Sequence, residues 1–154
     1  MRTLPNELTM HTSSDLAAMS AAALYRIARL RQEVFVVEQH CVYLDLDGRD
    51  AEAGTTLLWA EDAAGDVAAT MRVLREDALE PGLSSIGRVA TAPAWRGRGV
   101  AAVLLDAAIQ SCDGDPILIH AQSYLTDWYG RFGFRASGPE FVEDGIPHTP
   151  MRIG

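Results

Sequence analysis

The stretch from Arg88 to Ala108, RVATAPAWRGRGVAAVLLDAA, indicates the fold more specifically than any other part of the chain. A strand candidate ends at Pro93, a turn of arginines and glycines follows, and a helix with a regular apolar side begins near Gly99. Glycines let a backbone approach a ligand closely, and the first turn of a helix presents unpaired N–H groups and a positive dipole end. The segment therefore predicts a binding site for an anion such as a diphosphate.

Two common phosphate-binding motifs do not fit this turn. A Gly-x-x-x-x-Gly-Lys-Ser/Thr run is absent, and Gly-x-Gly-x-x-Gly fails because Ala102 stands where the third glycine is needed. The βαβ repeat that should surround a dinucleotide-binding turn is also missing. These departures argue against a P-loop and against a Rossmann fold.

Length and composition limit the classes that remain. The 154 residues, 48% of them hydrophobic, suit one compact domain over residues 1–154. A net charge of −8 argues against nucleic acid or an anionic membrane as a partner. Cys41 and Cys112 read as free thiols of a reducing compartment, and no apolar run approaches the roughly 20 residues of a membrane span. We expect a cytoplasmic protein with no membrane partner.

Hydrophobic periodicity predicts an α/β layered fold of the α+β type. An amphipathic helix is expected over residues 20–33, and the β-branched run VFVVEQ (residues 34–39) is expected to leave it. The pattern further predicts a hairpin of strands 55–61 and 66–74, strands 84–91 and 116–120, helices 99–112 and 124–132, and two terminal strands. This order favours a mostly antiparallel sheet.

Several motifs, in the right order, resemble the GNAT N-acetyltransferase superfamily. Arg96-x-x-Gly99-x-Ala101 resembles its acetyl-CoA-binding motif, and Asp127 to Phe134 (DWYGRFGF) resembles its second signature. The ElaA-like branch is resembled most closely, through four further segments: Leu30–Gln39, Asp45–Gly48, Ile86–Val89 and Glu143–His148. The resemblance implies a single GNAT domain with a mixed, mostly antiparallel central sheet flanked by helices on both faces. Family members are often dimers, so it also allows a homodimer.

The resemblance implies acetyl-CoA as the acyl donor and no metal. By position, the backbone of Val89, Ala90 and Thr91 would bind the pantetheine arm. The pyrophosphate would lie on the turn formed by Arg96, Gly97, Arg98, Gly99, Val100 and Ala101. Gln122 follows a strand near the expected cofactor cleft, where it would orient a substrate or a water, or cap the next helix.

The activity that the resemblance implies is acetyl transfer to a primary amine of a small molecule or peptide, by direct attack in a ternary complex. Tyr129 stands where the family places its general acid, and no arrangement typical of a covalent nucleophile is evident. Two residues are candidates for the base. Burial after an apolar run would raise the pKa of Glu38, unless it is a salt-bridged structural carboxylate, and His148 precedes the last strand near the acceptor side.

Three points stay open at this stage. A non-catalytic acyl-CoA-binding or sensing module is the alternative function. The acidic residues between Asp45 and Glu52 form either a solvated loop or a rim that attracts a cationic amine; they do not have the glycine position of an EF-hand. His120, at the end of an apolar strand, reads as a hydrogen-bonded core histidine.

Overall fold

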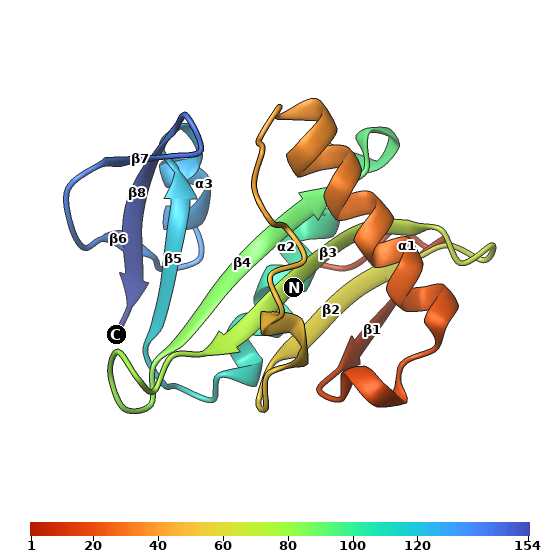
Figure 1. Ribbon diagram of the computed structural model, residues 1–154, viewed down its shortest axis with the longest axis horizontal. Helices are drawn as coiled ribbons and strands as arrows, with labels where there is room; N and C mark the ends of the chain where they lie inside the picture. Colours follow the sequence, from red (N-terminus) through yellow and green to blue (C-terminus); the bar gives the residue numbers. More distant parts are fainter.

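The computed structural model describes residues 1–154 and contains one eight-stranded sheet (Figure 1). The strand order is β1-β2-β3-β4-β5-β8-β6, and β7 pairs with β8 off this path. Only β4 and β5 are parallel; every other pair is antiparallel. The strands are β1 (Thr9–Ser13), β2 (Thr56–Glu61), β3 (Val67–Arg75), β4 (Ser84–Thr91), β5 (Ile117–Gln122), β6 (Arg135–Ala136), β7 (Phe141–Glu143) and β8 (Ile146–Ile153).

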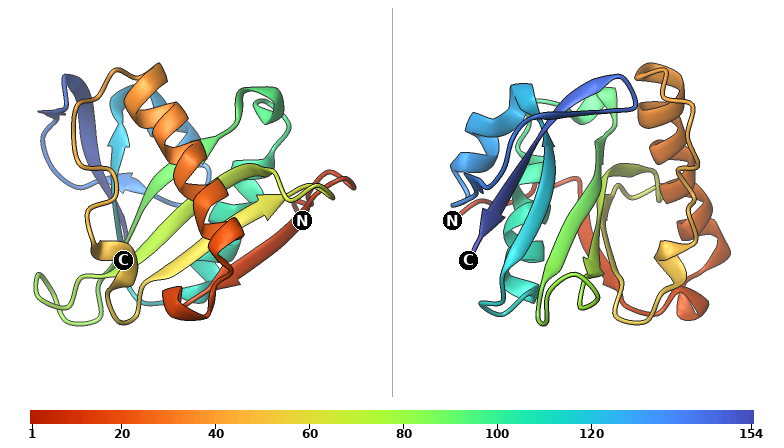
Figure 2. Two further views of the ribbon diagram at one scale, coloured as in Figure 1. Left: turned by 45° about the vertical axis from the view of Figure 1, so that its right-hand side comes forward. Right: turned by 60° about the vertical axis from the view of Figure 1, so that its left-hand side comes forward.

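Helices cover both faces of the sheet, as Figure 2 shows most clearly in its right-hand view. Helix α1 (Ala21–Arg31) continues into a π-helix, η2 (Gln32–Glu38), on one face, and α2 (Val100–Ser111) packs on the other. The remaining helix, α3 (Thr126–Gly130), follows β5. Short 3-10 turns occupy Leu16–Ala18, Arg49–Ala51, Pro93–Trp95 and Ser123–Leu125. This arrangement confirms the predicted mixed, mostly antiparallel α+β fold.

Each face of the sheet has its own apolar core. On one face α2 buries Val100, Leu104 and Leu105 against the sheet, including Met71 and Ile117. On the opposite face α1 and η2 cover a smaller cluster, formed by Ile27, Leu30, Val34, Phe35, Leu57, Trp59, Val67 and Ala90. Burial on two sides holds β3 firmly in place, and β3 supports the neighbouring strand β4, which carries one wall of the candidate site.

The end of the first helix differs from the sequence prediction. Ser20 caps α1 as expected, because its hydroxyl accepts the Ala23 N–H at 3.1 Å. The expectation that VFVVEQ leaves the helix is wrong for all but its last residue, since the chain stays helical through Glu38. The Gln39 N–H closes a wide turn on the Val34 carbonyl at 3.0 Å. Packing of the Val34 and Phe35 side chains against the sheet outweighs their weak helix propensity.

Candidate active site

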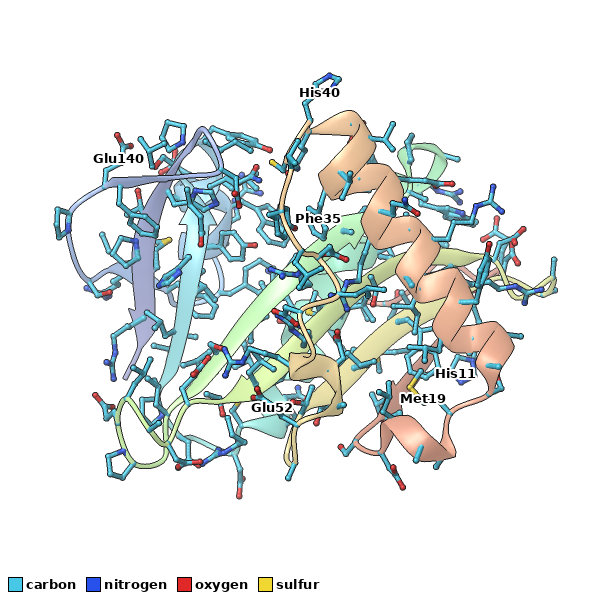
Figure 3. The ribbon with its side chains drawn as sticks, in the orientation of Figure 1. His11, Met19, Phe35, His40, Glu52 and Glu140 are labelled. Atoms are coloured by element: carbon cyan, nitrogen blue, oxygen red, sulfur yellow. The ribbon has the colours of Figure 1, made fainter.

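A large cleft opens where β4 and β5 separate. The two strands pair only at Ser84–Ile117 and Ser85–Leu118, and they diverge beyond these residues (Figure 1). The cleft measures about 1080 Å³ and is lined by both strands, by η2, by α3 and by the β7–β8 turn. Figure 3 shows Phe35, one of the lining residues, on the side of the helix that faces β4, whereas His40 points away from the molecule. The cleft is large enough for a cofactor-sized ligand.

A β-bulge shapes the β4 wall of this cleft. Thr70 of β3 pairs with Ala90 and Arg72 pairs with Gly87, so two residues of β4 stand opposite one residue of β3. Arg88, in the bulge, has a left-handed backbone with φ 51°. A bulge leaves a residue out of the ladder and redirects the strand, and beyond Ser85 no ladder joins β4 to β5. The backbone that follows the bulge therefore borders the cleft.

The predicted pantetheine-binding residues occupy this wall. Val89, Ala90 and Thr91 all line the cleft, at the part of β4 that has left β5. Gln122 lines the opposite side, and its side-chain amide donates to the Gln39 side chain at 3.3 Å. It does not cap the helix that follows β5.

The turn before α2 has the features of an anion site. Gly97 and Gly99 have φ values of 74° and 76°, which favour glycine, and a Cβ at either would meet open space. The helix begins its own hydrogen bonds only with the Val103 N–H, which donates to the Gly99 carbonyl. None of the six backbone amides from Gly97 to Ala102 donates to another protein group. A second cavity, of about 180 Å³, lies against this turn. The site fits a diphosphate, which needs N–H donors and a positive dipole end.

The Arg96 guanidinium is held by the last residue of the π-helix. It donates to the two Glu38 carboxylate oxygens at 2.7 and 2.6 Å, and to the Thr91 carbonyl at 3.1 Å. Hydrogen bonding by Arg96 lowers the pKa of Glu38, whose side chain is 44% exposed. The expectation that burial raises the pKa of Glu38 is therefore wrong, and the salt-bridged alternative is correct. A carboxylate with a lowered pKa is a weak base for catalysis.

The Arg98 side chain lies outside both cavities. Its guanidinium is 3.5 Å from a Glu7 carboxylate and stacks over the Trp95 ring, with 4.3 Å from Cζ to the ring centroid. The structure therefore gives this guanidinium no place at the expected pyrophosphate site. Arg98 contributes to the free donors of the turn through its backbone amide, not through its side chain.

Tyr129 is buried at the edge of the cleft. Its ring contacts those of Trp128 and Phe134 edge-on. Burial raises the pKa of Tyr129 to about 12, so the phenol stays protonated at neutral pH. Its side chain lines the cleft, and no protein group hydrogen-bonds to its hydroxyl. The hydroxyl is therefore a free donor.

His148 lies across the cleft and is only 9% exposed. The expectation that it precedes the last strand is wrong, because β8 begins at Ile146 and includes it. Its Nδ1 is 2.7 Å from the Ile146 carbonyl, and its ring stacks on Phe141. A carbonyl oxygen can only accept, so Nδ1 carries the proton when the ring is neutral. Nε2 then has a free lone pair, and the nearest carboxylate oxygen, from Glu143, is 3.9 Å away. This tautomer leaves Nε2 able to accept a proton.

The acidic segment after residue 44 is neither a solvated loop nor a free anionic rim. Its carboxylates form a network with three arginines, which we call the arginine–aspartate network: Arg31, Arg72, Arg88, Asp45, Asp47 and Asp50. Arg31 is 2% exposed and Asp45 is 7% exposed. Hydrogen bonds from Arg72 and the Arg49 amide overcome the effect of burial and lower the pKa of Asp47 to about 2. Both predictions for this segment, a solvated loop and a rim for a cationic amine, are therefore wrong. The sequence did not indicate the ion pairs because the partners lie 14 to 43 residues apart.

The position of His120 also differs from the sequence prediction. It is exposed rather than buried in the core, lines the cleft, and contacts the Phe141 ring edge-on. Strand alternation contained the signal, because Leu118, His120 and Gln122 share one face of β5 and that face borders the cleft. The structure contains no cluster of three or more His, Cys, Asp or Glu side chains that could hold a metal, and no helix with the length and apolarity of a membrane span.

Comparison with known proteins agrees with this geometry. Residues 17–154 match the acetyltransferase (GNAT) domain family. The chain is 46% identical to the UPF0039 protein Rv2851c of Mycobacterium tuberculosis, over 86% of this chain and 85% of that protein. It is 37% identical to the protein ElaA of Escherichia coli, over 86% and 88%. The crystal structure of an acyl-CoA N-acyltransferase from Pseudomonas aeruginosa superposes with a TM-score of 0.87 at 36% identity, over 96% of this chain and 99% of that chain. The protein belongs to the GNAT acetyltransferase family, among its ElaA and UPF0039 members.

Proposed function

We propose that this protein is an N-acetyltransferase that transfers an acetyl group from acetyl-CoA to a primary amine of a small molecule or peptide. One observation carries the proposal. Free backbone donors at Gly97–Ala102 lie at one end of the β4–β5 opening. The Tyr129 and His148 side chains line the cleft in that opening, and neither the Tyr129 hydroxyl nor His148 Nε2 has a hydrogen-bond partner. These groups match the three needs of the reaction: an anion site, an acid and a base.

Acetyl-CoA supplies an acetyl thioester, whose carbonyl carbon the amine attacks, so that a C–N bond forms and the C–S bond breaks. The amides of Gly97 to Ala102 would bind its diphosphate, together with Arg96 once that side chain leaves Glu38. Val89, Ala90 and Thr91 would hold the pantetheine arm along β4. A backbone N–H next to the bulge would stabilise the negative charge that develops on the carbonyl oxygen.

Proton transfers then fall to two side chains. A lysine-like amine has a pKa near 10.4 and is mostly protonated at neutral pH, so removal of its proton costs about 4–5 kcal/mol. In the proposal His148 Nε2 accepts this proton, while Nδ1–H stays on the Ile146 carbonyl. The Tyr129 hydroxyl donates to the departing CoA sulfur, and its high pKa keeps it protonated until then. Glu38 takes no part as a base, because Arg96 holds its charge.

The test is release of free thiol from acetyl-CoA over a panel of primary amines. Wild-type protein should release thiol with at least one amine, Tyr129→Phe should be slower by 10- to 100-fold, and His148→Ala should be slower by about 100-fold. His11→Ala is the matched histidine control, since His11 stacks on Trp59 outside the cleft. Tight CoA binding without thiol release over the whole panel would favour the non-catalytic binding module instead.

A further inference from the structure

We infer that Gly87 sets the size of amine that can reach the thioester, because the absence of a side chain there keeps the acceptor end of the cleft open. The inference rests on the proposed function, and it adds a specificity-determining residue that the acid, base and anion site do not include.

The backbone conformation at Gly87 does not require a glycine. Ten of the thirteen glycines have positive φ values, where a side chain would be strained. Gly87, Gly130 and Gly138 are the exceptions, and of these three only Gly87 lines the cleft. Glycine inside a strand weakens it and commonly marks a bulge or the close approach of a ligand. The bulge that follows Gly87 is formed by Arg88 and Val89, neither of which is glycine, so the close approach of a ligand is the remaining reason.

The space beside Gly87 is empty of protein atoms. A Cβ built at this position would meet nothing within 4 Å. Gly87 pairs with Arg72 of β3, and residues paired across antiparallel strands share a face. The Arg72 guanidinium on that face binds the Asp47 carboxylate at 2.8 and 3.1 Å. The open space therefore lies on the face that carries the Arg72–Asp47 pair.

Polar residues that line the cleft indicate that the space beside Gly87 receives the acceptor amine rather than the acyl chain of the thioester. Ser85, Asp47 and His120 line the same cleft, and on β4 Gly87 lies on the side of the bulge away from the anion-binding turn. An amine with polar substituents can form hydrogen bonds with such walls, whereas an alkyl chain would gain no such contact. An acceptor that crosses this region passes over Gly87, where added side-chain volume would meet it.

The experiment compares wild type with Gly87→Ala and Gly87→Val on two amines, ethylamine and the bulkier 3,3-diphenylpropylamine. The readout is the ratio of kcat/KM for the small amine to that for the large one. The ratio should rise with side-chain size, by about tenfold or more for Gly87→Val, because pockets discriminate by such factors for one or two carbons. The melting temperature should change by only a few degrees, and the acetyl-CoA Kd should stay within about twofold, because neither depends on this space.

A loss of turnover that is equal for both amines, or no loss, would overturn the inference while leaving the proposed function standing. Absence of turnover by the wild type with every primary amine would overturn the proposed function itself, and the inference with it. General damage to the fold is recognised separately, because it would lower the melting temperature and would not change the ratio.

Discussion

Two regions that border the same cleft differ in whether their groups already have partners within the protein. In the arginine–aspartate network, each carboxylate and each guanidinium has a partner of opposite charge within the protein. In the turn from Arg96 to Ala102, six backbone amides donate to nothing and two glycines keep the approach open. A region of paired buried charges stabilises the fold, whereas exposed backbone donors with no protein partner remain available to a ligand.

The arginine–aspartate network gives the largest expected effect. Arg31→Ala should lower the free energy of unfolding by about 3–5 kcal/mol, because it removes the buried guanidinium that bridges the Asp45 and Asp50 carboxylates. The measurement is chemical denaturation. Arg29→Ala is the control, since Arg29 pairs with Glu33 on the surface and should cost at most about 0.5 kcal/mol. A loss below 1 kcal/mol for Arg31→Ala would show that the network is not structural.

A substitution in the turn should have the next largest effect, and the quantity that changes is CoA affinity rather than stability. Gly99→Asp should weaken CoA binding by about 100-fold, because it adds a charge and a Cβ where the diphosphate would lie. Gly114→Asp is the matched control: Gly114 also has positive φ and open space, but it follows α2 at the far end. Both variants should lose similar stability, about 1 kcal/mol, and only Gly99→Asp should lose affinity. Equal affinities by calorimetry would contradict the assignment of the turn.

The Glu38–Arg96 pair links the π-helix to the turn. Glu38→Gln should tighten CoA binding by about two- to fivefold, because an exposed ion pair worth up to about 1 kcal/mol no longer competes for Arg96. Turnover should be retained, since Glu38 is not the base. Glu33→Gln is the control, because Glu33 pairs with Arg29 and not with the turn. Weaker CoA binding in Glu38→Gln would mean that the pair holds Arg96 in its binding position.

A comparably small effect is expected in the pH dependence of stability. The pKa of Asp47 is about 2 in the folded protein, below its ordinary value of 3.8. A lowered folded-state pKa stabilises the fold above pH 4, and this contribution disappears as the pH falls towards 2. With allowance for solvent screening it amounts to about 1 kcal/mol. The stability difference between wild type and Asp47→Asn should therefore shrink between pH 4 and pH 2, in denaturant titrations. A difference that is constant over this range would exclude the effect.

Local sequence patterns predicted most of the fold. The Ser20 cap, the hairpin of β2 and β3, and the strand–turn–helix unit around Gly99 all follow from neighbours in the sequence. Tertiary packing decided the rest. VFVVEQ stays helical because Val34 and Phe35 bury against the sheet, and the polar strand β1 forms because it pairs with β2 along its length. Neither cause is visible within a short window of residues.

The candidate site shows the same division. The motifs predicted the positions of Tyr129, His148 and the glycine turn, and the structure places all of them at the cleft or the adjoining cavity. Side-chain partners were less predictable. Glu38 binds Arg96 from 58 residues away, and Arg98 turns towards Glu7. Gly87 was not singled out for its own role, because only the backbone conformation distinguishes it from glycines that a turn requires.

Amide chemical shifts would show whether the free amides of the turn bind CoA. Two-dimensional ¹H–¹⁵N spectra of the protein titrated with CoA should show saturable shifts that are largest for the amides of Gly97 to Ala102. Gly114, at the opposite end of α2, should barely move. Saturable binding that leaves the 97–102 amides unchanged, or no binding at millimolar CoA, would contradict the account.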